Sequence, residues 1–308
     1  MDSAQFREQI AKFWRVNASD LPEELVRHAK NVPVDHLDED TAGSIAALDV
    51  YSSSDEDLPF VPKVRGRRYF EDDFRPAEQP WPVVLIHGTG ADRDYWQPLA
   101  DNLRADGWGV YAPNFGNHGT RLIEDSAAEV DAFIRAVLAH TGAEQVILVG
   151  HSQGGLLARY WMRHLDGARR TKHLICLSSP NHGTTLGGIA SPLVTTKLAE
   201  KAMRSLIERA LGPAAFQQIA GSDFLDKTNE GGDVEEDVTY TCIATRFDAI
   251  VQPPESCFLY SPSRTQVRNI WVQDVARGVQ VLHDDMPHDT RVIRLVRAAL
   301  HSLAPEQD

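Results

Sequence analysis

The feature that most constrains this chain is an apolar strand that leads directly into a serine between two glycines. Residues 146–149 are Val-Ile-Leu-Val, residues 150–154 are Gly-His-Ser-Gln-Gly, and the helix-forming residues 156–161 follow at once. A strand-to-helix turn this tight brings the residues two before and two after Ser152 together, so glycine fits at both positions. The pattern predicts that Ser152 is a nucleophile, held at the end of a strand beside a helix N-terminus that favours developing negative charge.

From Trp81 onward, short apolar runs alternate with helical runs. The clearest helix is expected to begin with a capping box formed by Ser126 and Glu129 and to end at Gly142. Continuous Val/Ile/Leu-rich strands are typical of a sheet covered by helices on both faces. The alternation therefore predicts an α/β fold with a doubly wound, mostly parallel sheet. The expected strands are residues 83–86, 109–112, 145–149, 173–178, 238–244 and 267–272.

The rest of the chain divides around this pattern. Residues 1–76 are expected to form an N-terminal extension, in which a short amphipathic helix precedes an acidic stretch. This stretch, residues 33–60, holds eight acids and no Lys or Arg, which is typical of a flexible, solvated segment. Residues 77–308 are expected to form a catalytic domain. Within it, residues 185–236 lack a strand pattern and are interpreted as a helical cap or lid, with helices expected near 193–211 and 213–220. Ordinary surface helices are the alternative.

Charge and cysteine content exclude several classes of protein. The formal net charge of −13 argues against nucleic acid and anionic lipid as partners, while docking on lipid through an apolar patch stays open. The three cysteines are too few for a disulfide framework, and their spacing suits no metal site. Cys176 is expected in the core, whereas Cys242 and Cys257 could pair in an oxidising compartment.

The N-terminus lacks the basic start and apolar core of a secretory signal, and no stretch approaches the length of a membrane-spanning helix. As written, the chain is expected to be soluble and cytoplasmic. Its oligomeric state is not predicted.

A serine nucleophile needs a base, and the base needs an acid that orients it. Asp248 follows the expected strand 238–244 and is the candidate acid, with Asp274 as the alternative; the acids between 223 and 237 precede that strand, at the wrong edge of the sheet. For the base, His283 and His288 both lie in the loop before the final helix, and spacing alone does not separate them. His301 is expected on the exposed side of that helix.

An acyl-transfer site also needs preorganised donors for an oxyanion. The backbone N–H of Gln153, which follows the nucleophile, is one candidate. The other is the backbone N–H of Thr89, in the His87-Gly88-Thr89-Gly90 turn after the first strand. The Thr89 hydroxyl could add a further hydrogen bond. The His-Gly steps at residues 87–88, 118–119 and 182–183 are interpreted as structural or as pocket lining.

Five stretches together are more specific than any one motif: residues 82–89, 149–159, 179–184, 222–225 and 244–251. Over about residues 80–303 the chain resembles the secreted actinobacterial triacylglycerol lipases of the α/β-hydrolase superfamily (lipase class 2). The resemblance implies Ser152 as nucleophile and Asp248 as acid. It also implies His283 as base, because the family's histidine precedes a Pro-aromatic-Asp step that residues 287–289 occupy here, with His288 in place of the aromatic. The missing signal peptide and the acidic extension depart from the family.

The sequence therefore predicts a serine hydrolase that cleaves carboxylic esters without a metal or an organic cofactor. A lipase that acts on acylglycerols is the first expectation. A carboxylesterase, a polyester hydrolase or an acyltransferase would use the same residues. A binding protein with this fold but no activity is a different class, and it is disfavoured because the chain offers a candidate for every catalytic role in the expected order.

Overall fold

The computed structural model describes residues 78–185, 211–263 and 266–303, and the structural statements below refer to these residues. The helix expected near the N-terminus, the acidic stretch 33–60 and nearly all of the helix expected at 193–211 lie outside them. The described parts of the proposed cap are residue 185 and residues 211–236.

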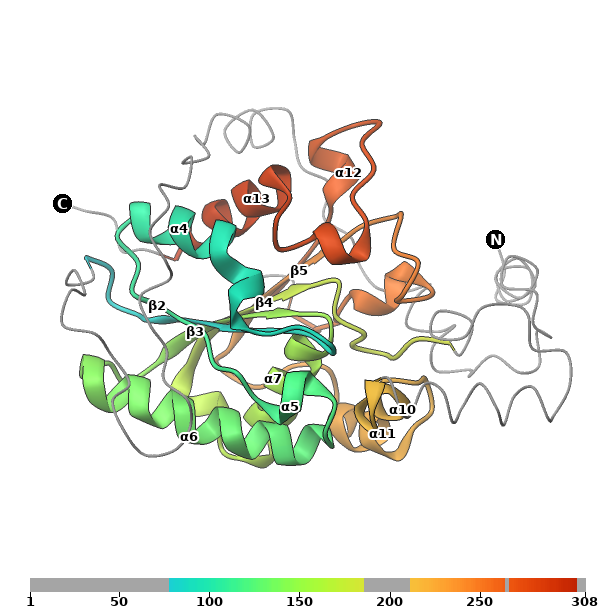
Figure 1. The fold of residues 1–308 in the computed structure, drawn as a ribbon, viewed down its shortest axis with the longest axis horizontal. Coiled ribbons are helices and arrows are strands. Elements are labelled where there is room, and N and C mark those ends of the chain that lie inside the picture. Colours follow the sequence, from blue (N-terminus) through green and yellow to red (C-terminus); the bar gives the residue numbers. More distant parts are fainter. Residues whose placement is uncertain (1–77, 186–210, 264–265, 304–308) are drawn as a thin grey trace, which may run out of the picture.

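A parallel sheet of six strands forms the middle layer of the described structure (Figure 1). The order is β2-β1-β3-β4-β5-β6, and each neighbouring pair is parallel, so the predicted sheet is confirmed. Because β1 lies between β2 and β3, the chain reverses its direction across the sheet there, and such a switch point is where α/β folds place ligands. The strands are β1 (Val83–Ile86), β2 (Val110–Tyr111), β3 (Val146–His151), β4 (Thr171–Leu177), β5 (Thr239–Ala244) and β6 (Val267–Trp271).

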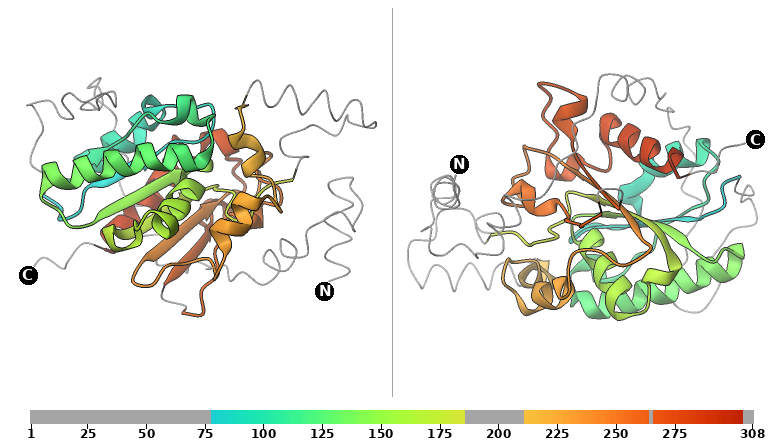
Figure 2. Two further views of the ribbon diagram at one scale, coloured as in Figure 1. Left: turned by 90° about the horizontal axis from the view of Figure 1, so that it is seen from below. Right: turned by 180° about the vertical axis from the view of Figure 1, so that it is seen from behind.

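Helices cover both faces of the sheet (Figures 1 and 2). One face carries α4 (Gln97–Ala105), α12 (Val272–Val275) and α13 (Thr290–His301). The other face carries α5 (Gly116–Gly119), α6 (Ile123–Thr141) and α7 (Gln153–His164), with α10 (Ala214–Gln217) and α11 (Asp223–Asn229) beside α5. Single turns of 3₁₀ helix are η2 (Arg93–Trp96), η3 (Ala168–Arg170), η4 (Pro254–Cys257) and η5 (His283–Asp285).

Strand alternation explains why there are two cores. In β1, Val83 and Leu85 belong to the cluster formed with α4 and α13, whereas Val84 and Ile86 belong to the cluster formed with α6 and α7. All four side chains are completely buried. Burial of one such side chain contributes about 1.5–3 kcal/mol, so the two apolar layers fix the sheet between its helices.

The start of α6 differs from the prediction. The helix begins at Ile123, so Ser126 lies inside it, buried, and forms no capping box. The cap is tertiary instead: the Gln217 side-chain carbonyl, 94 residues along the chain, accepts the Ile123 N–H at 2.7 Å. Glu129 holds the preceding loop, because it accepts the Gly116 N–H at 3.0 Å. The predicted end is confirmed, with Gly142 in the left-handed conformation at φ 71°.

The three cysteines are free, buried thiols. Cys242 lies within β5 and is the register partner of Cys176 of β4. Cys257 lies in η4 and is not bonded to Cys242, so the pairing considered above is absent from the structure.

Candidate active site

Ser152 occupies a sharp turn at the carboxyl end of β3, between His151, the last strand residue, and Gln153, the first residue of α7. Its backbone has φ 52° and ψ −125°, a conformation that residues with a side chain rarely adopt. The Ser152 N–H donates to the Leu177 carbonyl of β4 at 2.9 Å, which helps to hold the turn. Strain of this kind, held by its surroundings, is common at functional sites.

The two flanking glycines are required by close approach of the backbone. A Cβ atom at Gly150 would lie 2.3 Å from the Gly155 nitrogen, and one at Gly154 would lie 2.0 Å from the Ile86 carbonyl oxygen. Both distances are far below van der Waals contact, so a side chain at either position would push the helix away from the strands. The spacing of glycines in the sequence thus corresponds to a steric requirement in the fold.

Asp248 and His283 form a buried pair at the carboxyl edge of the sheet. Asp248 lies in the loop after β5, and its Oδ2 is 2.8 Å from Nδ1 of His283, the first residue of η5. Its Oδ1 accepts the N–H groups of Ile250 at 2.9 Å and Val251 at 2.8 Å, which fixes the carboxylate. Because a carboxylate accepts, the His283 proton sits on Nδ1, and Nε2 carries the lone pair that a general base needs.

His151, the residue before Ser152, connects the His283–Asp248 pair to the serine turn through a hydrogen bond. Its Nε2 lies 3.0 Å from the His283 carbonyl oxygen, and the two rings are 4.9 Å apart. Burial, reinforced by the neighbouring His283, lowers the pKa of His151 well below its ordinary value. The ring is therefore neutral, and its single proton must be on Nε2, since a carbonyl only accepts. No local pattern in the sequence predicts this role for His151, because the residue between Gly150 and Ser152 carries no signal of its own.

The other histidines considered as a base lie elsewhere. His288 is exposed; its Nε2 donates to the Tyr95 carbonyl at 2.7 Å, and its ring meets the Tyr95 ring edge-on at 4.4 Å. His301 is exposed on α13, as expected, 3.4 Å from Asp106. The structure brings His283, and neither of these, into contact with Asp248.

The alternative acid is also separate. Asp274 lies in α12, and its Oδ1 is 2.9 Å from the Arg246 guanidinium. The structure therefore joins the first choice of acid to the histidine that the resemblance implies, whereas Asp274 forms an ion pair with Arg246.

The turn after β1 lies directly against the serine. A Cβ atom at Gly88 would stand 3.0 Å from the Ser152 Cβ, so the backbone of this turn passes beside the nucleophile. The next residue is Thr89. Gln153 directly follows Ser152 in the chain and is the first residue of α7. Its N–H group is free for an oxyanion, because the first N–H groups of a helix have no acceptor within the helix. Both candidate oxyanion donors thus adjoin Ser152.

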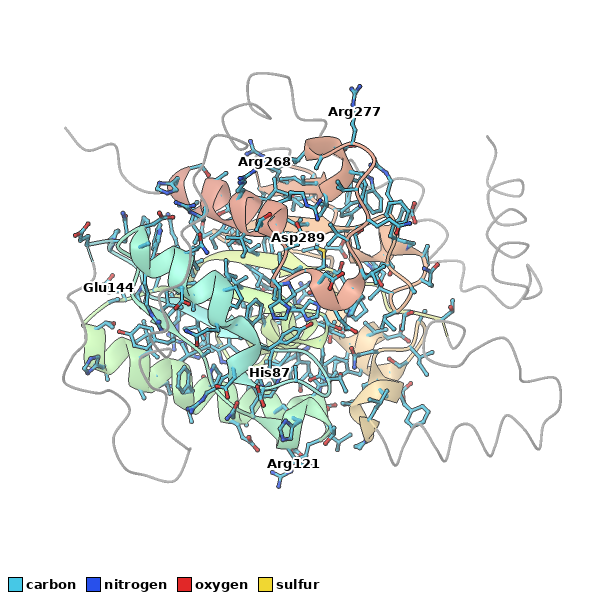
Figure 3. All side chains as sticks on the ribbon, turned by 45° about the horizontal axis from the view of Figure 1, so that its top comes forward. His87, Arg121, Glu144, Arg268, Arg277 and Asp289 are labelled. Carbon is cyan, nitrogen blue, oxygen red and sulfur yellow. The ribbon has the colours of Figure 1, made fainter. Side chains whose placement is uncertain are left out.

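The three His-Gly steps have distinct environments. His87, labelled in Figure 3, is completely buried. Its ring stacks on Phe115 with ring centres 4.0 Å apart, and burial lowers its pKa to about 4. Its Nδ1 donates to the Gly88 carbonyl at 2.9 Å. His118 is exposed, 3.2 Å from the Ala91 carbonyl.

His182, in the third step, forms a second buried histidine–aspartate pair, which no local pattern in the sequence predicts. Its Nε2 lies 3.1 Å from Oδ2 of Asp233. The same oxygen accepts the Tyr260 N–H at 2.7 Å, and the Arg159 guanidinium is 3.9 Å from Oδ1. Asp233 was grouped with acids at the wrong edge of the sheet, yet it is only 6% exposed and belongs to an interior charge network.

The described ranges 78–185, 211–263 and 266–303 contain no group of three or more His, Cys, Asp or Glu side chains placed to hold a metal ion. Within the same ranges, no helix is both long enough and apolar enough to cross a bilayer.

A parallel sheet with this switch point, a strained serine turn and a histidine–aspartate pair at its carboxyl edge define a class of protein. The chain has the alpha/beta hydrolase fold. The model of that fold family matches residues 82–233, and lipase B of Aspergillus fumigatus has a similar structure, with a TM-score of 0.62 and 20% identity over 100% of this chain and 78% of that one.

Among curated relatives, the chain is similar to triacylglycerol lipases of Pseudarthrobacter phenanthrenivorans and Burkholderia plantarii. Each is 39% identical over 91 residues, which is 27% of this chain and 28% or 25% of the relative, respectively. The chain thus matches about a quarter of the length of these relatives.

Proposed function

We propose that this chain is a carboxylic ester hydrolase in which Ser152, His283 and Asp248 form the catalytic triad. The observation that carries the proposal is the continuous set of contacts from Asp248 to the Nδ1 of His283 and from the His283 carbonyl to His151, the residue before Ser152. The named activity of the relatives, triacylglycerol lipase, supports ester hydrolysis over other reactions of a serine nucleophile.

In the proposed reaction, His283 Nε2 takes the proton of the Ser152 hydroxyl as the oxygen attacks the ester carbonyl. Asp248 holds the imidazole in the required tautomer and stabilises the imidazolium that forms. His283 then gives the proton to the leaving alcohol, which departs and leaves an acyl-enzyme. Water, activated by the same imidazole, attacks the acyl-enzyme and releases the carboxylic acid.

The negative charge that develops on the carbonyl oxygen is stabilised by the backbone N–H groups of Thr89 and Gln153. Such donors act where water is excluded, and the loss of one typically lowers kcat by about 10²–10³-fold. The α7 N-terminus, which begins at Gln153, adds its dipole to the same region.

We further propose an acylglycerol substrate and a place among the lipase class 2 enzymes of actinobacterial type, with residues 185–236 as the cap. Support comes from three exposed apolar side chains, Phe247, Ile250 and Leu282, which flank Asp248 and His283 in the chain and are 41%, 41% and 54% exposed. We call these three residues the apolar rim. An apolar surface beside the site suits an acyl chain.

Replacement Ser152→Ala tests the reaction. Hydrolysis of p-nitrophenyl esters should disappear while circular dichroism and the unfolding midpoint stay close to those of the parent. Ser302→Ala is the matched control and should keep full activity. Ser302 is an exposed residue directly after α13, and its hydroxyl donates only locally, to the Ala299 carbonyl at 2.7 Å. Turnover retained in Ser152→Ala would overturn the assignment of the nucleophile.

A rate profile over acyl lengths from C2 to C16, with soluble and emulsified esters, tests the substrate. A lipase should favour long chains and gain rate on the emulsion. A maximum at C2–C4 with no gain on the emulsion would favour a carboxylesterase.

A further inference from the structure

Thr184 lies in the loop that follows β4 and is 2% exposed. Its backbone N–H donates to the Gln218 carbonyl at 2.9 Å, and its own carbonyl accepts the Ala220 N–H at 2.9 Å. The two bonds form a parallel β-bridge between Thr184 and Ile219. The segment that follows α10 therefore holds the backbone of Thr184 in place, and with it the position from which the hydroxyl reaches its own partners.

The hydroxyl contacts the loop that begins with the candidate acid, residues 248–252, which we call the acid loop. Oγ1 of Thr184 donates to the Ile250 carbonyl at 2.6 Å and accepts the Gln252 N–H at 3.0 Å. Because a carbonyl only accepts and an N–H only donates, the direction of both bonds is fixed. The Thr185 N–H adds a bond to the Gln252 carbonyl at 3.1 Å. Thr184 and its neighbour thus brace the acid loop.

A single peptide group, between Ile250 and Val251, joins Thr184 to the candidate acid. Its carbonyl accepts the Thr184 hydroxyl, and its N–H donates to Oδ1 of Asp248 at 2.8 Å. Hydrogen bonds in such a chain polarise one another, so the bond to the carbonyl strengthens the N–H as a donor. The chain continues from Oδ2 of Asp248 to Nδ1 of His283, also at 2.8 Å.

The acid loop needs an external brace because part of it is open to solvent. Ile250 is an exposed member of the apolar rim, and the Ile250 and Val251 N–H groups that hold the Asp248 carboxylate belong to the same short loop. Such local bonds are weak singly, because water can replace them. A bond from the buried Thr184 to the other end of the Ile250–Val251 peptide restricts the loop to the conformation in which its N–H groups face the carboxylate.

We propose that Thr184 is a positioning residue for the candidate acid: its hydroxyl, bonded to Ile250 and Gln252, holds the acid loop so that the Asp248 carboxylate faces His283. The inference rests on the proposed ester hydrolysis and deepens it. Without the hydroxyl, the Ile250–Val251 peptide is free to rotate, and the carboxylate loses the donors that orient it. Thr184 acts through Asp248 and not on the reacting atoms.

The variants Thr184→Val and Thr184→Ser separate the hydroxyl from the shape of the side chain. With p-nitrophenyl acetate as substrate, Thr184→Val should lower kcat by about 10–100-fold through misplacement of the acid, while KM changes little. Thr184→Ser keeps the hydroxyl and should recover most of that loss. If Thr184→Val does not fold, Thr184→Ala replaces it with the same expectation. A kcat at the parent value in the folded variant without the hydroxyl overturns the inference.

Thr171→Val is the matched control. Thr171 is a completely buried residue of β4, and its hydroxyl also donates to a backbone carbonyl, that of Gly167 at 3.0 Å. Its replacement should lower the unfolding midpoint and leave kcat unchanged. A fall of kcat as large as that in Thr184→Val would overturn the inference, because the loss of any buried hydroxyl would then have the same effect.

A double-mutant cycle with Asp248→Asn tests whether Thr184 acts through the acid. Once the carboxylate is gone, Thr184→Val should lower kcat no further. An equal loss of kcat from Thr184→Val in both backgrounds overturns the inference.

Proton NMR of the protein without substrate tests the same contact independently of activity. The Nδ1 proton of His283, bonded to Asp248, should give a low-field signal that is absent from Asp248→Asn. This signal should shift or broaden in Thr184→Val and stay in place in Thr184→Ser and Thr171→Val. An unchanged signal in Thr184→Val overturns the inference.

Failure of the proposed function has a different signature. In that case the parent protein hydrolyses no ester, or Ser152→Ala retains turnover, whatever the Thr184 variants do. An active parent and an inactive Ser152→Ala, combined with an additive cycle or an unchanged NMR signal in Thr184→Val, reject the role of Thr184 alone.

Discussion

Residues 78–185, 211–263 and 266–303 contain two buried histidine–aspartate pairs, and only one of these two has the surroundings of a catalytic dyad. His283 and Asp248 approach to 2.8 Å, and His182 and Asp233 approach to 3.1 Å. In both pairs the side chains are almost inaccessible to solvent. Distance and burial therefore do not distinguish them.

The pairs differ in which ring nitrogen meets the acid. His283 uses Nδ1, close to its own backbone, and so keeps the outer nitrogen, Nε2, for a reacting group. His182 commits its outer nitrogen to Asp233. A general base must present a nitrogen to the nucleophile while the acid holds the other one, so the first arrangement suits catalysis and the second suits a structural tie.

The charges around the two acids differ as well. Burial by itself raises the pKa of Asp233, but the charge of His182, its hydrogen bond and the charge of Arg159 together hold it well below the ordinary range. Asp248 is held instead by the N–H groups of Ile250 and Val251. A short contact between a histidine and an aspartate identifies a candidate for a catalytic dyad. Whether the pair is catalytic or structural depends on the group that also contacts the aspartate, Arg159 for Asp233 and two backbone N–H groups for Asp248.

Replacing each acid by its amide should give the largest contrast. Asp248→Asn keeps the shape but favours the wrong tautomer of His283, so kcat should fall by about 10⁴-fold, as in other triads. Asp233→Asn, measured per folded molecule, should stay within about tenfold of the parent, because it does not touch the proposed triad. Similar losses of kcat in both variants would contradict the assignment of His283–Asp248 as the catalytic pair and His182–Asp233 as the structural one.

Stability should show the reverse order. Asp233→Asn leaves Arg159 buried beside a neutral side chain and should lower the free energy of unfolding at neutral pH by about 3–5 kcal/mol. Asp248→Asn should cost less, about 1–3 kcal/mol, because it disturbs hydrogen bonds and leaves no arginine unpaired. Urea denaturation measures both, and a larger loss from Asp248→Asn would contradict the structural role of the second pair.

The advantage of the parent over Asp233→Asn should also depend on pH. The pKa of Asp233 is lower in the folded state than in the unfolded chain, so the unfolded chain binds the extra proton first. The stabilisation is therefore complete above the unfolded pKa of about 4 and declines as the pH falls below it. Urea midpoints of both proteins from pH 6 to pH 2.5 measure the difference, and an advantage that grew on acidification would have the wrong sign.

His151 sharpens the comparison, because it links only the first pair to the serine. His151→Phe removes the bond to the His283 carbonyl and should lower kcat by about 10–100-fold through misplacement of the base. His151→Gln places an N–H donor near the position of Nε2 and should recover part of that loss. Equal kcat values for the two variants would show that the hydrogen bond does not position His283.

The smallest expected effect concerns His173, another buried histidine, whose ring contacts hydroxyl groups. His173 lies between the hydroxyls of Thr239 and Thr241 on β5, at 2.7 and 3.1 Å, and burial lowers its pKa to about 3. The unfolded chain binds the proton near pH 6.5, so stability falls as the pH drops from about 6.5 toward 3. His173→Gln should flatten that decline by about 1.4 kcal/mol per pH unit and leave kcat unchanged. An unchanged slope would mean that His173 is not neutral in the fold.

Much of the fold followed from local patterns in the sequence. The six strands were predicted to within a few residues. The signal is strongest for β1 and for residues 146–149 of β3, which are continuous apolar runs that both faces of the sheet bury. The start of α6 was missed because its cap, Gln217, comes from a distant segment. Local sequence cannot reveal a partner 94 residues away.

The candidate site likewise combines residues that local sequence predicts with residues whose contacts come from distant segments. The positions of Ser152, Asp248 and Thr89 follow from one rule, that the residues after parallel strands meet at one edge. His283 needed the family resemblance, since spacing alone left His288 open. His151 and the His182–Asp233 pair escaped prediction because their roles arise from side-chain contacts between distant segments.

The most direct test of the central claim is labelling with a fluorophosphonate probe, which reacts with an activated serine. We expect one labelled residue, Ser152, located by mass spectrometry of the digested protein. Labelling should fall to background in His283→Ala, a variant in which kcat should drop by about 10⁶-fold, and should proceed at nearly the parent rate in folded His182→Ala. Label on another residue, or loss of labelling in folded His182→Ala with labelling retained in His283→Ala, would contradict the account.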